Sequence, residues 1–201
     1  MLKNICVFCG SSHGSNRLYS NVTEDLGRVL LKRQFSLIYG GARIGLMGSI
    51  ASIIHQQGGE VIGVIPRALV DREVAYKDLS DLRIVDSMHE RKNLMFQLSD
   101  GFIALPGGLG TLDEFFEILT WAQLGIHTKP CGLLNINGYF DHLIAFLKHA
   151  VNEYFLDSEY LDIVLIDENP DFLLDKMMSY LPPKIDKAKR ALQKSNQWID
   201  L

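Results

Sequence analysis

Short apolar runs alternate along the chain with longer segments in which apolar residues recur every three or four positions. The short runs predict strands, at 5–9, 36–39, 61–65, 82–85, 102–105, 131–135 and 163–166. The longer segments predict helices, at 18–33, 46–57, 88–98, 111–124, 139–153 and 171–181. This alternation predicts an α/β fold, in which a doubly wound, Rossmann-like parallel sheet of about seven strands carries helices on both faces.

The same pattern predicts how the chain is divided. We expect one α/β domain over residues 1–181 and a C-terminal helical tail over 182–201. The tail is basic between Lys184 and Lys194, and Ile185, Ala188 and Leu192 form one weak apolar face. A solvated helix that docks on the surface or on a partner subunit is favoured over a role in ligand binding.

Composition and charge exclude several classes of partner. The 201 residues are 47% hydrophobic and 22% charged, which supplies a substantial core, and the formal net charge is -4. A net negative charge creates no overall positive electrostatic potential that would attract nucleic acid or an anionic membrane. No apolar stretch approaches ~18 residues, and no secretory signal is recognisable at the first residues. We therefore expect a cytoplasmic location, with no nucleic acid and no membrane as partner.

The cysteines and histidines suggest neither redox chemistry nor a metal site. Cys6 and Cys9 have CxxC spacing, but both fall within a predicted strand and three positions apart, so they should face opposite sides of the sheet. They are best interpreted as small apolar strand residues. No HxxxH pair or Cys/His cluster occurs, and we expect no metal.

The most informative stretch is LPGGLGTLDE, residues 105–114. It follows an apolar strand and leads into a helical pattern, and Pro106 cannot continue a central strand. Glycines let backbone N–H groups approach an oxyanion closely, and the N-terminus of a helix favours negative charge. A phosphate is the expected occupant.

Small residues also follow two other predicted strands, as Gly10-Ser11-Ser12 and as Gly40-Gly41-Ala42. Ligands of such folds bind at the carboxyl ends of the strands, so these loops should converge on one crevice. The usual nucleotide fingerprints are absent: residues 10–14 and 108–113 do not fit GxGxxG, and Leu46-Met47 replaces the Lys-Ser/Thr of a P-loop. A single phosphate on a smaller nucleotide fits better than a dinucleotide or a triphosphate.

The second informative stretch is SMHERKNLM, residues 87–95. Ser87 and Glu90 form an S-x-x-E capping box that places a helix start there. Arg91 and Lys92 then fall in the first turns, where cations oppose the helix dipole. Helical spacing puts Arg91 on the stripe Met88, Met95 and Leu98, which should face inward. A buried guanidinium needs an anionic partner, which is either a ligand or a structural ion pair with a carboxylate such as Glu114.

Glu114 itself has two interpretations of equal weight. It can serve the ligand, or it can complete a capping box with Thr111 at the start of the predicted helix. A carboxylate beside a phosphate site repels the phosphate, so the ligand should turn its sugar toward Glu114. Asp113 and Glu117 are expected to be helix-dipole partners or surface charges.

Read in order, CVFCGSS, YGGARIGLMG, MHERK, PGGLGTLDE and TWAQLGIHTKP make residues 5–151 similar to the LOG (LONELY GUY) family. Its members are phosphoribohydrolases, which release the free base from a cytokinin riboside 5′-monophosphate or AMP and leave ribose 5-phosphate. The label "lysine decarboxylase", common among relatives, is not supported, because Lys92 within a nucleotide motif is a poor Schiff-base lysine. Two departures from the family pattern are Ala42 in place of a glycine and Leu109 in place of an aromatic residue.

The resemblance implies roles for individual residues. Arg91 and Glu114 correspond to the catalytic pair. The residues that correspond to substrate contacts are Glu73, Met88, Lys92, Gly107, Gly108, Leu109, Gly110, Thr111 and Thr120. No cofactor is implied, and a homo-oligomer is, most simply a dimer with its site near the subunit interface. Two alternatives from other classes are a non-catalytic nucleotide-binding or cofactor-carrier module of the same fold and, less favoured, an oxidoreductase.

Overall fold

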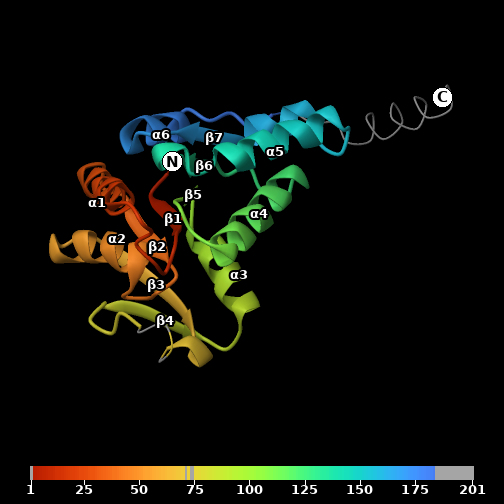
Figure 1. Ribbon diagram of the computed structural model, residues 1–201. Helices are drawn as coiled ribbons and strands as arrows, with labels where there is room; N and C mark the ends of the chain where they lie inside the picture. Colours follow the sequence, from red (N-terminus) through yellow and green to blue (C-terminus); the bar gives the residue numbers. More distant parts are fainter. Residues whose placement is uncertain (1, 71, 73–74, 184–201) are drawn as a thin grey trace, which may run out of the picture.

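A single parallel sheet organises the computed structural model, which describes residues 2–70, 72 and 75–183 (Figure 1). Among these residues the sheet has seven strands in the order β4-β3-β2-β1-β5-β6-β7, and every pair is parallel. The strands are β1 Asn4–Phe8, β2 Ser36–Tyr39, β3 Val61–Pro66, β4 Asp81–Val85, β5 Gly101–Ala104, β6 Cys131–Leu134 and β7 Val164–Asp167. The predicted α/β fold class is confirmed.

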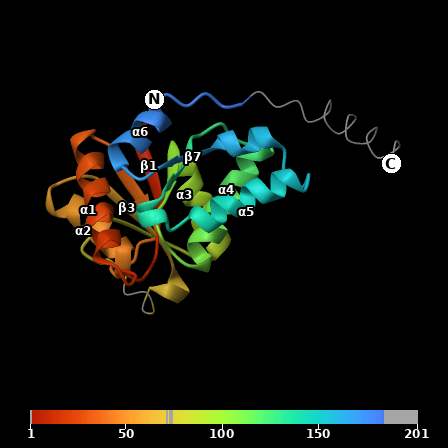
Figure 2. The same ribbon diagram turned by 45° about the horizontal axis from the view of Figure 1, so that its top comes forward.

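Helices cover both faces of the sheet (Figures 1 and 2). The α-helices in the described part of the chain are α1 Arg17–Lys32, α2 Gly45–Gln56, α3 Met88–Leu98, α4 Leu109–Gln123, α5 Asp141–Asn152 and α6 Pro170–Met178. Helices α1, α2 and α6 pack on one face, and α3, α4 and α5 on the other. Three short 3-10 helices, η1 Arg67–Leu69, η2 Ile136–Gly138 and η3 Ser158–Ile163, lie in the connections.

The predicted strands all form, each within one residue of the expected bounds, because their residues are mostly buried on both faces. Cys6 and Cys9 lie in the cores on opposite faces, as predicted. Burial raises the pKa of both thiols and of Cys131, so all three stay protonated. The predicted helix over 171–181 ends early, at Met178. The predicted tail lies outside the described residues from 184 onward.

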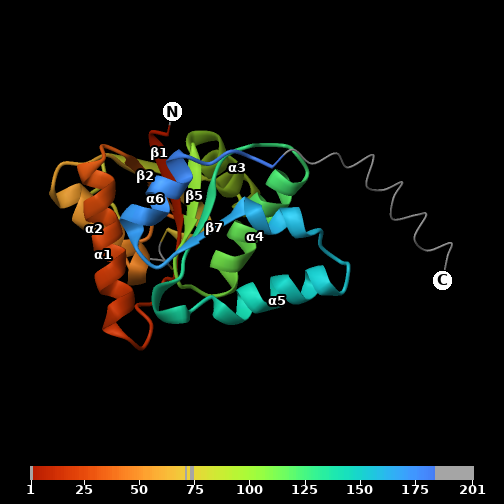
Figure 3. The ribbon, with the colours of Figure 1, turned by 90° about the horizontal axis from the view of Figure 1, so that it is seen from above.

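The order of the strands fixes where a ligand can bind. From β1 the chain first builds outward through β2, β3 and β4, and then returns to pair β5 with the other side of β1. The chain leaves β1 toward α1 on one face and leaves β5 toward α4 on the other, so a ligand is expected at the carboxyl ends of these two strands. In Figure 3 the loops after β1 and β6 lie at this same edge of the sheet.

Within the described ranges, no helix has the length and apolar character needed to cross a bilayer.

One ion-pair cluster ties the first helix of the fold to the last. Arg33 ends α1, and its Nε lies 2.8 Å from Asp171 Oδ1 while its Nη1 lies 2.7 Å from Asp175 Oδ1, both on α6. A further hydrogen bond joins Nη2 to the Asp171 carbonyl at 3.1 Å. The guanidinium is largely shielded from water, which makes these contacts stronger than those of a typical surface pair.

We predict that Arg33→Met lowers the free energy of unfolding by about 1–2 kcal/mol, because it removes several charge-assisted hydrogen bonds at once. Arg28→Met is the matched control, since Arg28 is half exposed and pairs with Glu24 and Asp25 of its own helix rather than with another element. Its loss should stay below ~0.5 kcal/mol. Urea titrations of both variants measure the difference, and equal losses would contradict the proposed role of Arg33.

Candidate active site

Two loops and the start of α2 meet at the backbone of Gly10, which follows β1. The Gly10 N–H donates to the Pro106 carbonyl at 3.0 Å, and the Gly10 carbonyl accepts from the Leu46 N–H of α2 at 3.1 Å. The predicted convergence on one crevice is confirmed for the loops after β1 and β5, which line the same hollow. In the loop after β2, Gly40 lies against the Arg91 side chain instead.

The glycine turn, residues 106–110, leads into α4 earlier than predicted. Gly108 is the N-cap with extended backbone angles, and the Leu112 N–H donates to its carbonyl at 3.1 Å. Helix α4 therefore begins at Leu109, so Thr111 lies in the first turn and Glu114 in the second. Of the two interpretations of Glu114, the capping box with Thr111 is wrong, because Gly108 is the N-cap and the buried Thr111 side chain packs back against Gly107.

The start of α4 offers free backbone amides next to open space. The first amides of a helix have no partner within the helix, so those of Leu109, Gly110 and Thr111 face outward at its positive end. A Cβ added at Gly108 or Gly110 would meet no described atom within 4 Å, and neither residue has a positive φ. The fold therefore does not require glycine at 108 or 110, and the space is available to a ligand. Leu109 is exposed at the rim of this turn.

Gly107 differs from these two glycines. A Cβ at this position would collide with the Thr111 side chain and would lie 2.9 Å from the Gly10 nitrogen. Glycine is thus needed here for the close approach of two loops.

Arg91 of α3 is buried among backbone carbonyls at the ends of two strands. Its Nε donates to the Val64 carbonyl at 3.1 Å, and its Nη2 donates to the Gly40 carbonyl at 3.1 Å. Gly40 has no room for a Cβ because the Arg91 guanidinium occupies that place. The prediction that Arg91 points inward is confirmed.

The carboxylate nearest to this guanidinium is that of Glu114. Its Oε1 lies 3.8 Å from Arg91 Nη1, and the two side chains are only 12% and 6% exposed. At 3.8 Å the contact is a charge pair rather than a tight hydrogen bond, and two carbonyls already hold the guanidinium. The arrangement presents an acidic oxygen, anchored by a cation, one turn beyond the free amides of α4.

The start of α3 is formed as predicted, with one difference. Ser87 Oγ accepts from the Glu90 N–H at 3.1 Å, whereas the Glu90 carboxylate accepts from Asp86 N–H at 2.9 Å rather than from Ser87.

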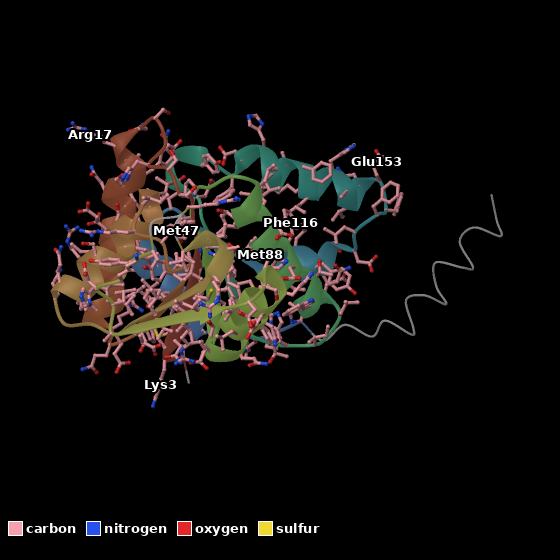
Figure 4. The ribbon with its side chains drawn as sticks, turned by 90° about the horizontal axis from the view of Figure 1, so that it is seen from below. Lys3, Arg17, Met47, Met88, Phe116 and Glu153 are labelled. Atoms are coloured by element: carbon pink, nitrogen blue, oxygen red, sulfur yellow. The ribbon has the colours of Figure 1, made fainter. Side chains whose placement is uncertain are left out.

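The prediction that Met88 faces inward is wrong, because this first residue of α3 is exposed at the edge of the sheet. Its sulfur nevertheless lies 3.7 Å from Arg91 Nη1. Figure 4 shows Met88 and Met47, which border the Arg91 site.

Lys92 joins α3 to α4. Its Nζ lies 3.2 Å from Glu117 and 3.3 Å from Asp113. Asp113 is exposed, as expected of a surface charge, and both carboxylates in addition pair with Lys92. Burial acts to lower the pKa of Lys92, but the two carboxylates raise it above its ordinary value. A Schiff base requires a neutral amine, so Lys92 does not fit pyridoxal chemistry.

The described residues contain no group of three or more His, Cys, Asp or Glu side chains able to hold a metal ion.

A hollow of about 340 Å³ opens beside the glycine turn. Its walls are the loop after β1, the glycine turn, the first turns of α1 and α2, and the residue that follows η2. The lining residues are Gly10, Ser11, Ser12, His13, Gly14, Tyr19, Leu46, Pro106, Gly107, Gly108 and Tyr139. Tyr139 is not among the site residues predicted from the sequence. The available signal was its position shortly after the predicted strand at 131–135, at the edge of the sheet where ligands bind.

The structure brings together most but not all of the predicted site residues. One edge of the sheet carries the glycine turn together with the side chains of Arg91, Glu114, Lys92 and Met88. Thr120 lies about 13 Å further along α4 than Thr111, and its hydroxyl donates to the Phe116 carbonyl at 2.7 Å. Thr120 borders a different, apolar groove between α4, α5 and η3. Glu73 lies outside the described residues.

Comparison with known proteins identifies the family. The family described as "Possible lysine decarboxylase" matches residues 47–177. The cytokinin riboside 5′-monophosphate phosphoribohydrolase LOG5 of Arabidopsis thaliana is 46% identical over 180 residues, which cover 90% of this chain and 79% of that protein. This chain belongs to the LOG family. A probable LOG enzyme of Oryza sativa, LOGL2, is 44% identical over 180 residues, with 90% and 74% covered.

Solved structures with the same fold include proteins of another class. The molybdenum cofactor binding protein of Rippkaea orientalis superposes with a TM-score of 0.66 at 22% identity, over 89% of this chain and 97% of that protein. The molybdenum cofactor carrier protein of Chlamydomonas reinhardtii gives a TM-score of 0.65 at 16% identity, over 90% and 100%. At these identities the likeness extends to the fold alone.

We predict opposite effects of one added methyl group within the glycine turn of this LOG protein. Gly107→Ala should lower the free energy of unfolding by about 1–3 kcal/mol, because the methyl group meets Thr111 and Gly10. Gly110→Ala, in a helix and facing open space, should leave stability unchanged or raise it by up to ~1 kcal/mol. Urea unfolding of both variants checks this, and a loss of equal size at both positions would contradict it.

Proposed function

We propose that this LOG protein hydrolyses the N-glycosidic bond of a nucleoside 5′-monophosphate, either a cytokinin riboside 5′-monophosphate or AMP. The products are a free adenine-type base and ribose 5-phosphate. The observation that carries the proposal is the buried Arg91–Glu114 pair, which stands one helical turn beyond the free amides of α4. The names of the relatives, phosphoribohydrolases at 44–46% identity, support it.

In this proposal the phosphate binds at the start of α4. The amides of residues 108–111 donate to its oxygens, and the helix dipole adds to the attraction. The open space at Gly108 and Gly110 allows the phosphate to approach the backbone closely. Lys92, held by Asp113 and Glu117 at the side of the same helix, adds a positive charge nearby. Fixing the phosphate in this way positions the ribose relative to Glu114.

Glu114 then acts on the sugar. As the C1′–N bond breaks, positive charge develops on the ribose, and a nearby carboxylate stabilises it. Glu114 also orients the attacking water, whose oxygen bonds to C1′ while one of its protons ends on the departing base. Arg91 acts as a positioning residue, because its two carbonyl contacts fix the guanidinium that faces the Glu114 carboxylate.

The assay for this function uses the purified protein with AMP and with isopentenyladenosine monophosphate. We expect free base and ribose 5-phosphate in equal amounts, detected by chromatography. Tight binding of the nucleotides without release of base would favour a carrier module of the same fold instead.

We predict that Glu114→Gln lowers kcat at least about a hundredfold, equivalent to ~3 kcal/mol in the barrier, with the melting temperature little changed. The amide keeps the shape of the side chain but removes the negative charge that faces the ribose. Glu153→Gln is the control, because Glu153 is exposed at the far end of α5 (Figure 4). Unchanged kcat in Glu114→Gln would remove Glu114 from the mechanism.

We further propose that the protein forms a homodimer through α4 and α5. Large apolar side chains stand exposed on these helices and on the segments that follow them, namely Leu124, Ile126, Phe146, Tyr154 and Phe155. Three of them, Leu124, Phe146 and Phe155, are sequence neighbours of Gln123, Leu147 and Leu156, which line the apolar groove that Thr120 borders. Burial of this surface against a second copy would remove it from water. A cytoplasmic location stays a prediction from the sequence.

Phe146→Glu should convert this dimer to a monomer, because it places a charge within the apolar surface. Phe172→Glu is the matched control: Phe172 is 61% exposed, against 62% for Phe146, but lies on α6 at the other face of the sheet. Light scattering after gel filtration measures the mass of each. A wild-type monomer, or dissociation of both variants alike, would contradict the proposed interface.

A further inference from the structure

Tyr139 contacts the glycine turn from a neighbouring loop. It lies between η2 and α5, and its hydroxyl donates to the Gly107 carbonyl at 2.6 Å. The two residues are far apart in sequence, and the bond joins the loop after β6 to the loop after β5. The Tyr139 ring is partly exposed, so its hydroxyl could bond to water instead. The bond is therefore not needed to satisfy a buried polar group.

The loop that carries Tyr139 is held firmly. Asn135 Oδ1 accepts from the Phe140 N–H at 2.7 Å, and Asn135 Nδ2 donates to Asp141 Oδ1 at 2.7 Å. The Tyr139 ring also packs edge-on against Tyr19 of α1, with ring centroids 5.8 Å apart. The hydroxyl is thus presented to Gly107 from a fixed position.

The bond to the carbonyl determines the direction of the next amide. In a trans peptide the C=O and the N–H point in opposite directions, so fixing the Gly107 carbonyl directs the Gly108 N–H away from Tyr139. The preceding peptide is fixed in the same way, because the Pro106 carbonyl accepts from the Gly10 N–H at 3.0 Å. The Pro106–Gly107 and Gly107–Gly108 peptides are therefore oriented before any ligand binds. No described side chain lies close enough to the Gly108 Cα to orient this peptide by packing against it.

We propose that Tyr139 is a positioning residue for phosphate recognition: its hydroxyl orients the Gly107–Gly108 peptide so that the Gly108 amide is ready to bind the nucleotide's phosphate. The proposal rests on the proposed function for the phosphate site at the start of α4 and for the identity of the nucleotide. Preorganised amides bind an oxyanion without paying for reorientation of the backbone, and the loss of one orienting bond weakens them.

The test is Tyr139→Phe in the full chain, which removes one oxygen atom and keeps the ring contacts. We expect the dissociation constant of ribose 5-phosphate, measured by calorimetry, to rise about five- to tenfold. The KM for AMP should rise similarly while kcat stays within about twofold, the pattern of an interaction made equally in the ground and transition states. The melting temperature should stay within about 2 °C, since the bond lies at the surface.

Tyr180→Phe is the matched control, because Tyr180 follows α6 and belongs neither to the glycine turn nor to the proposed dimer surface, and it should leave the affinity and KM unchanged. Wild-type affinity for ribose 5-phosphate in Tyr139→Phe would overturn the proposal. So would a fall in affinity matched by an equal fall in Tyr180→Phe. If the wild-type protein releases no base from AMP, the proposed function fails, while the calorimetry still decides the role of Tyr139.

Discussion

The buried guanidinium of Arg91 is the constraint on which the site depends. A charge taken out of water is stable only where each of its donors finds an acceptor, and here the acceptors come from the ends of β2 and β3, with the Glu114 carboxylate of α4 nearby. This requirement fixes the rotation of α3, excludes a side chain at Gly40 and brings α4 close to α3. A single ion thus sets the positions of four elements at the carboxyl edge of the sheet.

The glycines at this edge meet two different needs. Gly40 and Gly107 are small because another part of the protein occupies the place of their side chains. Gly108 and Gly110 are small although nothing in the described chain lies there. The first pair belongs to the packing of the fold. The second pair leaves room for a molecule to approach the backbone, and Gly108 also serves as the N-cap of α4. Gly40 and Gly107 thus shape the site through packing, whereas Gly108 and Gly110 leave space in it for a ligand.

Much of the fold could be predicted because burial on both faces leaves a clear pattern, as in the runs that became β2 and β5. The inward direction of Arg91 followed from helical spacing in the same way. The start of α4 could not be predicted, because Thr111 fits a capping pattern that its packing against Gly107 overrides. The exposure of Met88 depends on where α3 meets the sheet edge, and the Tyr139 contact joins loops that only the tertiary fold brings together.

The burial of the three thiols has a practical consequence. Cys6, Cys9 and Cys131 all lie in the cores against the sheet, and each is protonated and shielded from solvent. A thiol reagent can reach them only in molecules that have opened. The rate of their modification therefore reports the opening of the sheet at β1 and at β6, and no cysteine needs to be introduced for the measurement.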